Sequence, residues 1–239
     1  MFANDPLEAE PETKYIYSNN GINLIAAVIE QVQKRSYHEL AREFFRNFGM
    51  KFAQMDSYQE LIPNRGSQYS RILHKDGKFE ILKASISDDS RPFPHWPAGG
   101  VISNIDDLLM FSQNIIDIYH ERSKFLKAQT LKHMWNYETK VSSEKVSMKV
   151  NDHVIHDIKS HYVMGWSRYD FPIVDKMDIL SNLTIFFHIG AVGSSSAIKV
   201  IFPDQKFAFD AISDLGGVSG YLPELAVNAY FVLHDKSIK

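Results

Sequence analysis

The sequence of 239 residues contains no cysteine. This absence excludes a disulfide framework, a thiolate metal site and a cysteine nucleophile, although it leaves the redox compartment undetermined. No apolar run approaches the about 18 residues that a transmembrane helix needs, so we expect no membrane-spanning segment. The first eight residues match neither a secretory signal nor a transit peptide, so any targeting address is expected to lie outside this sequence.

The chain also lacks an excess of basic charge. It has 26 Lys and Arg against 29 Asp and Glu, which gives a formal net charge of −3. No broad positive field therefore draws it to nucleic acid, and we expect no nucleic-acid partner. Hydrophobic residues make up 44% of the chain, which is enough to bury a core in one domain or one large piece of a domain.

Helical periodicity dominates the first part of the chain. The spacing predicts a helix from residue 22 to 35, with one apolar stripe. Ser36 and Glu39 form a capping-box pattern that begins a second helix, which Gly49 ends. The stripe of the first helix contains Leu24, Ile25, Val28, Ile29 and Val32, and the inward face of the second contains Leu40, Phe44, Phe45 and Phe48.

The middle of the chain predicts a β-hairpin and a third helix. Residues 69–82 alternate like strands, and Asp76-Gly77 is a turn signal of the type I′ kind. Ser103 with Asp106 is the expected cap of a helix that reaches about Tyr119. We interpret the polar segment 141–159 as a loop or a solvated hairpin.

Strand patterns fill most of the remainder, and residues 221–234 predict a closing helix after Gly216-Gly217. Helices first and antiparallel strands later indicate the α+β class. The predicted strands are 162–169, 183–188, 197–202 and 206–213.

Four short segments occur in a specific order: Tyr17-Ser18-Asn19, Pro97-Ala98-Gly99-Gly100, Tyr162-x-x-Gly165-Trp166, and His188-Ile189-Gly190 followed by three serines. In this order they resemble the serine β-lactamase and penicillin-binding superfamily, and within it the mitochondrial serine β-lactamase-like proteins of animals. The resemblance implies a partial β-lactamase/transpeptidase-like fold. It also implies that residues 1–239 form a single β-lactamase-related domain that lacks its N-terminal portion.

The resemblance assigns roles to five residues. Enzymes of this superfamily use a serine nucleophile, a lysine three residues later and a tyrosine that relays the proton. Tyr17 is similar to that tyrosine, and Asn19 to the residue that positions substrate or lysine. His188 matches a Lys or His beside the nucleophile, Gly190 follows it in the substrate-binding strand, and the backbone N–H of Ala191 matches an oxyanion donor. No cofactor and no metal are implied.

The Ser-x-x-Lys pair itself is absent from its expected place. The superfamily places it before the tyrosine motif, and none of the sixteen residues before Tyr17 is serine. Two other matches to the spacing occur, Ser142 with Lys145 and Ser196 with Lys199. We interpret both as accidental, because the first lies in a polar segment and the second on a strand, where residues three apart point to opposite faces.

Two further positions depart from the superfamily pattern. Ile189 stands where a hydroxyl residue commonly binds a substrate carboxylate, so recognition of such a carboxylate is not expected. Glu12 stands at a turn glycine, which indicates a relaxed constraint or a different turn.

Structural alternatives stay open at the sequence level. Asn19 or Asn20 could simply cap the first helix, and His188 could be a core histidine. His153, His156 and His161 could suggest a metal site, but a solvated segment explains them better.

Two functional hypotheses follow. The first is a β-lactamase-like serine hydrolase or peptidase-type domain that acts on amides or esters, inactive in this chain because its nucleophile is missing. Its implied partners are a small-molecule or peptide substrate, and the resemblance implies a mitochondrial location with links to proteolysis and lipid metabolism. The alternative is a non-catalytic remnant in the mitochondrion or cytoplasm that binds partners or assembles as a homo-oligomer or filament.

Overall fold

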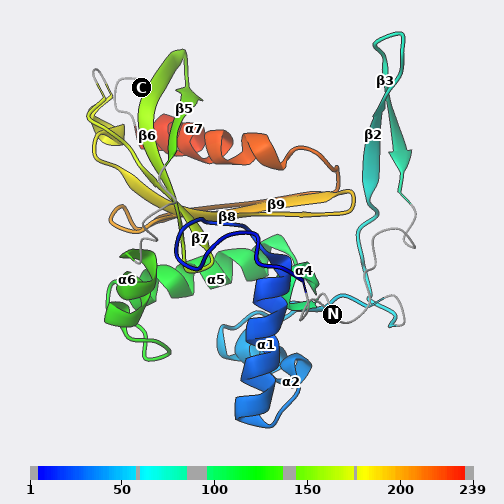
Figure 1. Cartoon of the computed structure of the whole chain (residues 1–239). Coiled ribbons are helices and arrows are strands. Elements are labelled where there is room, and N and C mark those ends of the chain that lie inside the picture. The colour runs from blue at the N-terminus through cyan, green and yellow to red at the C-terminus, as the bar shows by residue number, and fades with distance from the viewer. Residues whose placement is uncertain (1–4, 58–59, 85–95, 137–143, 175–176, 235–239) are drawn as a thin grey trace.

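The computed structural model describes residues 5–57, 60–84, 96–136, 144–174 and 177–234. A six-stranded antiparallel sheet forms the central layer, with helix α7 on one face and helices α5 and α6 on the other (Figure 1). The sheet order is β10-β9-β8-β7-β6-β5, so every strand pairs with its neighbour in the chain. The expected α+β architecture is confirmed.

The elements on the helical side come mainly from the first half of the chain. A short two-stranded pair, β1 with β4, and the β2–β3 hairpin also belong to this half. Their bounds are α1 (Asn19–Gln33), α2 (Tyr37–Asn47), β1 (Gln54–Met55), β2 (Tyr69–Leu73), β3 (Phe79–Lys83), α4 (Trp96–Gly99), β4 (Val101–Ile102), α5 (Ile105–Tyr119) and α6 (Ala128–Asn136).

The second half supplies the sheet and the helix that covers its other face. Two short 3-10 helices, η1 and η2, connect these elements. The bounds are β5 (Glu144–Val150), β6 (His153–Val163), β7 (Trp166–Asp170), η1 (Asp178–Leu180), β8 (Thr184–Val192), β9 (Ser195–Phe202), β10 (Phe207–Ser213), η2 (Ser219–Tyr221) and α7 (Leu222–His234).

Helix caps explain where the predicted helices begin. The capping box of Ser36 and Glu39 is present, with both reciprocal hydrogen bonds. At α5 the expected cap is wrong: Asn104, not Ser103, accepts the backbone N–H of Asp107 at 2.9 Å. The helix ends at Tyr119 as predicted.

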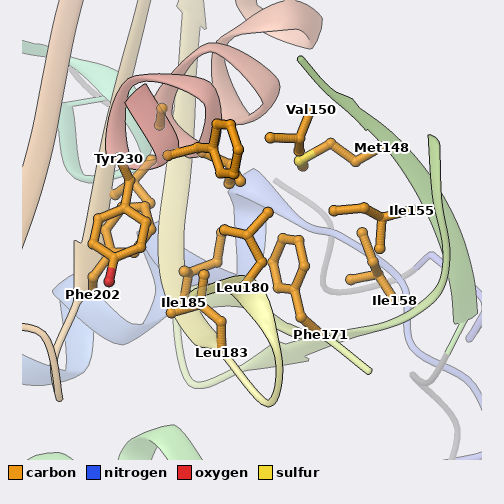
Figure 2. Packing of buried hydrophobic residues seen from close by; sticks show 14 of the residues in the cluster. Met148, Val150, Ile155, Ile158, Phe171, Leu180, Leu183, Ile185, Phe202 and Tyr230 are labelled. Carbon is orange, nitrogen blue, oxygen red and sulfur yellow. The ribbon is translucent and has the colours of Figure 1, made fainter. Parts of the chain in front are cut away.

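Alternating side chains divide the sheet between two hydrophobic cores. On β8, Ile185 and Phe187 pack toward α7, whereas Phe186 packs toward α5 and α6. Figure 2 shows the core on the α7 side, where Leu180 and Phe171 fill the space between strands and helix.

Two strand-region predictions need correction. Of the two alternatives for residues 144–159, the hairpin is confirmed and the loop is wrong, but the hairpin is not fully solvated: β5 and β6 form an edge hairpin whose inward face carries Ile155 and Ile158 into the α7-side core. Residues 162–169 are not one strand, since Gly165, at φ 77°, turns the chain between β6 and β7. Helix α6 was missed.

The β2–β3 hairpin is confirmed, but its turn is not type I′. Such a turn needs positive φ at both central residues. Gly77 has φ 81° and Asp76 is not in the left-handed region. The N–H of His74 donates to the Lys78 carbonyl at 2.9 Å and closes a three-residue loop instead, inside which the Gly77 N–H donates to the His74 carbonyl at 3.0 Å. Figure 1 shows the hairpin projecting from the body of the molecule.

The apolar stripe predicted on the first helix is present but uncovered. Its five residues, Leu24, Ile25, Val28, Ile29 and Val32, are between 41% and 70% exposed. Ala26 is the buried residue of α1. The described residues thus leave this helix face without a packing partner. Among the same residues, no helix is long and apolar enough to cross a membrane.

Candidate active site

The candidate site lies where strand pairing is incomplete. Strands β7 and β8 stop pairing at Ser167 and Phe187. Strand β8 continues beside β9 as far as Val192, which pairs with Ser195. Residues 188–192 therefore have one strand edge that β7 does not cover, and backbone groups on that edge are available to an extended ligand.

His188 stands at the start of this free segment and is held by both ring nitrogens. Its Nδ1 lies 2.9 Å from the carbonyl oxygen of Ile189, which can only accept, so Nδ1 carries the proton. Its Nε2 lies 3.2 Å from the hydroxyl of Tyr162 and accepts from it when the ring is neutral. Burial lowers the pKa of His188, and the bond to Ile189 opposes that shift. The ring is thus favoured as a neutral acceptor.

Three tyrosines gather around this histidine. The rings of Tyr15 and Tyr162 stack with centroids 4.8 Å apart, and Tyr17 lies 6.0 Å from Tyr162 and 6.4 Å from His188. Burial raises the pKa of Tyr15, and the neighbouring Tyr162 and Tyr17 add to the shift. Burial also raises the pKa of Tyr162. Tyr17, in contrast, is 53% exposed and accessible to a ligand.

Asn19 is the first residue of α1 and follows Tyr17 by two positions in the sequence. Ser18 caps the helix by accepting the backbone N–H of Gly21 at 3.0 Å, so the alternative that Asn19 or Asn20 is the cap is wrong. Asn19 is exposed in the first turn, and its side chain makes no hydrogen bond to the described residues.

Helix α4 connects α1 to β8, because it contacts both. A side chain at Gly99 would bring its Cβ within 3.2 Å of Cγ2 of Val192, so a residue without Cβ suits this approach. Gly190 is different. A Cβ there would lie 3.7 Å from Cβ of Ala197, an ordinary contact that imposes no need for glycine within the described part.

The other residues of the strand motif divide between the two faces. Gly190 and Ala191 are exposed on the free segment of β8. Ile189 instead packs against the α7-side core. Its side chain therefore serves the core.

Of the two alternative Ser-Lys pairs, the structure describes both members of one, Ser196 with Lys199, and these do not form a nucleophilic site. Lys199 lies on the α5 side of the sheet, where its Nζ donates to Ser112 Oγ and the Leu108 carbonyl at 2.7 Å each. Ser196 alternates with it on β9 and is 1% exposed on the other side. The prediction that this pair cannot act together is confirmed. Ser142 lies outside the described residues.

The histidine cluster of β6 is spread along the strand. His156 Nδ1 lies 2.9 Å from Ser147 Oγ, whereas His161 Nε2 lies 3.6 Å from Asp170 Oδ2. Within the described ranges, no group of three or more His, Asp or Glu is arranged to hold a metal ion.

Two residues of the site, Tyr15 and Tyr162, were given no role from the sequence. Tyr162 belongs to the Tyr-x-x-Gly-Trp segment, so its motif was visible although its contact with His188 was not. Tyr15 carries no motif beyond its place two residues before Tyr17. The structure thus brings Tyr17 and His188 together with two additional phenol rings.

Comparison with known proteins gives a family model, described as Beta-lactamase, that matches residues 1–218. The chain is also similar to the "Serine beta-lactamase-like protein LACTB, mitochondrial" of Mus musculus and of Homo sapiens, at 26% and 24% identity over 216 residues. In both comparisons the match covers 84% of this chain and 35% of the relative. The chain therefore spans about a third of the length of the curated relatives it matches.

Solved structures share its fold at low sequence identity. An octameric penicillin-binding protein homologue from Pyrococcus abyssi has a TM-score of 0.63 at 19% identity, over 91% of this chain and 43% of that one. A class C beta-lactamase mutant has a TM-score of 0.63 at 13% identity, over 97% and 60%. These likenesses confirm the expected β-lactamase/transpeptidase-like fold.

Proposed function

The chain belongs to the beta-lactamase family, and from this premise we propose that it supplies the tyrosine and histidine side of a serine acyl-transfer site. The observation that carries the proposal is the convergence of Tyr17, Tyr162 and His188 at the free edge of β8. In an acyl-transfer reaction, a serine oxygen bonds to the carbonyl carbon of an amide or ester and loses its proton to a base, and the bond from that carbon to the leaving nitrogen or oxygen then breaks as the amine or alcohol takes up the proton. Tyr17 is the accessible phenol that relays this proton.

His188 fits a supporting role in this scheme. With Nδ1–H committed to the Ile189 carbonyl, its Nε2 accepts the Tyr162 hydroxyl and keeps the second phenol in place. A neutral ring beside Tyr17 polarises the site without repelling the lysine that the family places next to the serine. The backbone of Gly190 and Ala191 lies on the exposed segment, where an N–H aimed at the developing oxyanion stabilises it.

We place the serine nucleophile on a chain segment outside residues 1–239. The exposed stripe of α1 supports this placement, because a helix with five uncovered apolar side chains offers a packing surface directly after the Tyr17 motif. Covering such side chains contributes roughly 25 cal/mol for each Å² of apolar surface removed from water. In that arrangement residues 1–239 are the later part of a single domain, and this chain alone is inactive.

The substrate proposed for this site is an amide or ester, either a small molecule or a peptide. The free edge of β8 supports an extended substrate that forms main-chain hydrogen bonds with residues 188–192. Ile189 offers no hydroxyl to a substrate carboxylate. We therefore do not propose a preference for carboxylate-bearing β-lactams.

Location and wider role are inferred from relatives alone. The relatives named above are described as mitochondrial, and we propose the mitochondrion for this protein, with the cytoplasm as the alternative. A part in proteolysis or lipid metabolism belongs to the same proposal.

A non-catalytic assembly role is the second candidate. The same exposed stripe favours it, since a second copy could cover α1 instead of a missing segment. The similar Pyrococcus abyssi protein is described as octameric. A homo-oligomer or filament with no acyl-transfer activity would result.

The test begins with the native protein from its source, whose mass and N-terminal sequence are compared with 27.4 kDa and Met1. A longer product with an upstream Ser-x-x-Lys is then treated with a serine-directed fluorophosphonate in the presence and absence of a competing ester. We expect competitor-sensitive labelling that Tyr17→Phe slows by at least about 100-fold, as for loss of a general acid–base group. Tyr221→Phe, at a 73% exposed position, is the matched control.

Two results decide between the candidates. Labelling that is absent from the longer product, or unaffected by Tyr17→Phe, contradicts the acyl-transfer proposal. A native product that begins at Met1 and elutes as a defined oligomer supports the assembly role. Labelling of residues 1–239 alone at Ser142 or Ser196 contradicts the placement of the nucleophile outside this chain.

A further inference from the structure

A cavity of about 260 Å³ opens on the α5 and α6 side of the sheet. Tyr119 at the end of α5, Lys132 on α6, and Arg168 and Thr184 on β7 and β8 line it, together with Asp204 in the β9–β10 turn. Its volume lies just below the range of about 300–1,000 Å³ that is usual for drug-sized ligands, which suits a smaller ligand of one ring with a short side chain.

This cavity is separate from the candidate active site. Thr184 begins β8, whereas His188 lies four residues further along the same strand. At about 3.3 Å of rise per residue, the two positions are roughly 13 Å apart. Phe186, which also lines the cavity, lies between them on the same face of the strand, so the cavity lies further along that face and does not include His188.

One cation at the cavity lacks an acidic partner. Nζ of Lys132 lies 4.6 Å from the ring centroid of Tyr119, and no carboxylate in the described part of the chain pairs with it. Arg168 differs, because its Nε donates to Asp170 Oδ1 at 3.0 Å. Lys132 therefore brings a positive charge that forms no ion pair with the described residues, although Asp204 lines the same cavity.

The acidic group at the cavity is already engaged. Asp204 Oδ1 accepts the hydroxyl of Tyr119 at 2.8 Å. Burial and this hydrogen bond raise the pKa of Tyr119 to about 12, so the phenol keeps its proton and remains the donor. An amine ligand would find Oδ1 of Asp204 already accepting from Tyr119, with Oδ2 left to it, whereas an anionic ligand meets the ammonium of Lys132, which has no ion-pair partner among the described residues.

Aromatic rings form the inner wall. Trp135 stacks on Phe186 with ring centroids 4.0 Å apart and an interplanar angle of 9°. Trp135 also lies 5.8 Å from Tyr119, centroid to centroid. Its Nε1 is buried and has no hydrogen-bond partner among the described residues. A buried donor without a partner is uncommon and costs about 1–3 kcal/mol, so its presence beside a cavity calls for a reason.

We propose that this cavity binds a small aromatic carboxylate. The carboxylate pairs with Lys132, and the ring of the ligand lies against Tyr119 and the Trp135–Phe186 stack. The amide of Asn136, which also lines the cavity, is exposed and available as a second donor. The proposal does not depend on acyl transfer, and it requires no residue of the candidate active site.

The test uses NMR titration of residues 1–239 with 3-phenylpropanoate and with its neutral analogue 3-phenylpropanamide. The chain has three tryptophans, so the indole N–H of Trp135 can be assigned and followed individually. We expect a saturable shift of this signal with the carboxylate and a much weaker response to the amide. Lys132→Gln should weaken carboxylate binding by about tenfold, the effect of losing a charge-assisted contact.

Lys124→Gln is the matched control, because Lys124 is exposed and does not line the cavity. It should bind the carboxylate as the unaltered chain does. Three results would overturn the proposal: no saturable shift at Trp135, equal responses to carboxylate and amide, or unchanged binding in Lys132→Gln. Retention of the Trp135–Phe186 contacts in the spectrum of Lys132→Gln separates loss of binding from loss of folding.

Discussion

The hydroxyl of Tyr162 lies 3.2 Å from Nε2 of His188, across the end of the intervening strand β7. The contact is possible because β7 stops pairing with β8 one residue before His188. With Nδ1–H donated to the Ile189 carbonyl, this arrangement favours the neutral ring. The protonation of His188 is therefore coupled to the folded structure.

His188 should make the protein more stable as the pH rises. Burial lowers its pKa below the ordinary value of 6.5, so below pH 6.5 the unfolded chain binds a proton that the folded chain resists. The unfolding free energy thus decreases as the pH falls from 6.5 to the lowered pKa of His188 in the folded protein. Below that pKa, His188 no longer contributes to the pH dependence. An NMR titration of His188 and urea unfolding at several pH values measure both effects.

His188→Gln is the comparison variant, since Gln keeps hydrogen-bonding groups and does not titrate. It should lose that part of the pH slope. A folded pKa of His188 at or above 6.5, or an identical slope in the variant, would show that the neutral ring is not favoured by the fold.

Local signals predicted α1, α2, α5 and α7, although not α6 or the cap of α5, because caps and periodicity act within a few residues. Ser36 with Glu39 gave the start of α2 correctly. For residues 144–159 the hairpin alternative was right, but its burial was not predicted, because the charges lie on the outward face while Ile155 and Ile158 complete the α7-side core. The contact between Tyr162 and His188 was also hidden by the register of the strands. Tyr162 pairs with Ser167, and Ser167 pairs with Phe187, so the register does not align Tyr162 with His188. That contact depends on where β7 ends, which is a property of the whole sheet.

The covering of α1 shows the same limit. Its periodicity predicted the helix and its apolar stripe, both of which are present. Periodicity says which side of a helix is apolar and does not identify what packs against it. The described residues leave Val28 and Val32 exposed, and no pattern in the sequence could have predicted this.

Asp107 should be one of the most sensitive positions outside the hydrophobic cores. Its buried carboxylate accepts three backbone N–H groups, from Lys51 at 2.8 Å and from Phe52 and Ala53 at 2.7 Å each. In Asp107→Asn, an NH₂ group would face one or more of these donors, so we expect a loss of at least about 2 kcal/mol in unfolding free energy. Urea denaturation measures it.

Asp106 provides the control, because it is an exposed acid in the same helical turn. Asp106→Asn should cost less than about 1 kcal/mol, the usual size of a helix-dipole contribution. Equal losses in the two variants would mean that the three backbone bonds of Asp107 contribute little.

Lys199 and Asp210 form a buried ion pair that joins α5 to the sheet. Nζ of Lys199 lies 2.5 Å from Asp210 Oδ1, and the carboxylate side chain is fully buried. Burial lowers the pKa of Lys199, while Asp210 opposes that shift. Asp210→Asn leaves the ammonium uncompensated and should cost about 3–5 kcal/mol in unfolding free energy.

The double variant Lys199→Met with Asp210→Leu removes both charges at once. It should be much less destabilised than Asp210→Asn, because no lone charge remains buried. Urea unfolding of the single and double variants measures the difference. If the double variant loses as much stability as the single one, the pair is held by packing and hydrogen bonds and not by charge compensation.

Glu12 offers a prediction of the opposite sign, because replacing it should stabilise the protein. Its backbone has φ 65°, in the left-handed region that disfavours a residue with a Cβ by roughly 1–2 kcal/mol. Part of the gain from Glu12→Gly is offset by the greater entropy of glycine in the unfolded chain. We expect a net increase of about 0.5–1 kcal/mol in unfolding free energy.

Glu10→Gly is the control, because Glu10 lies in the same turn but has no positive φ. This variant should be neutral or destabilising. A similar gain in both variants would show that the left-handed backbone of Glu12 is not the cause.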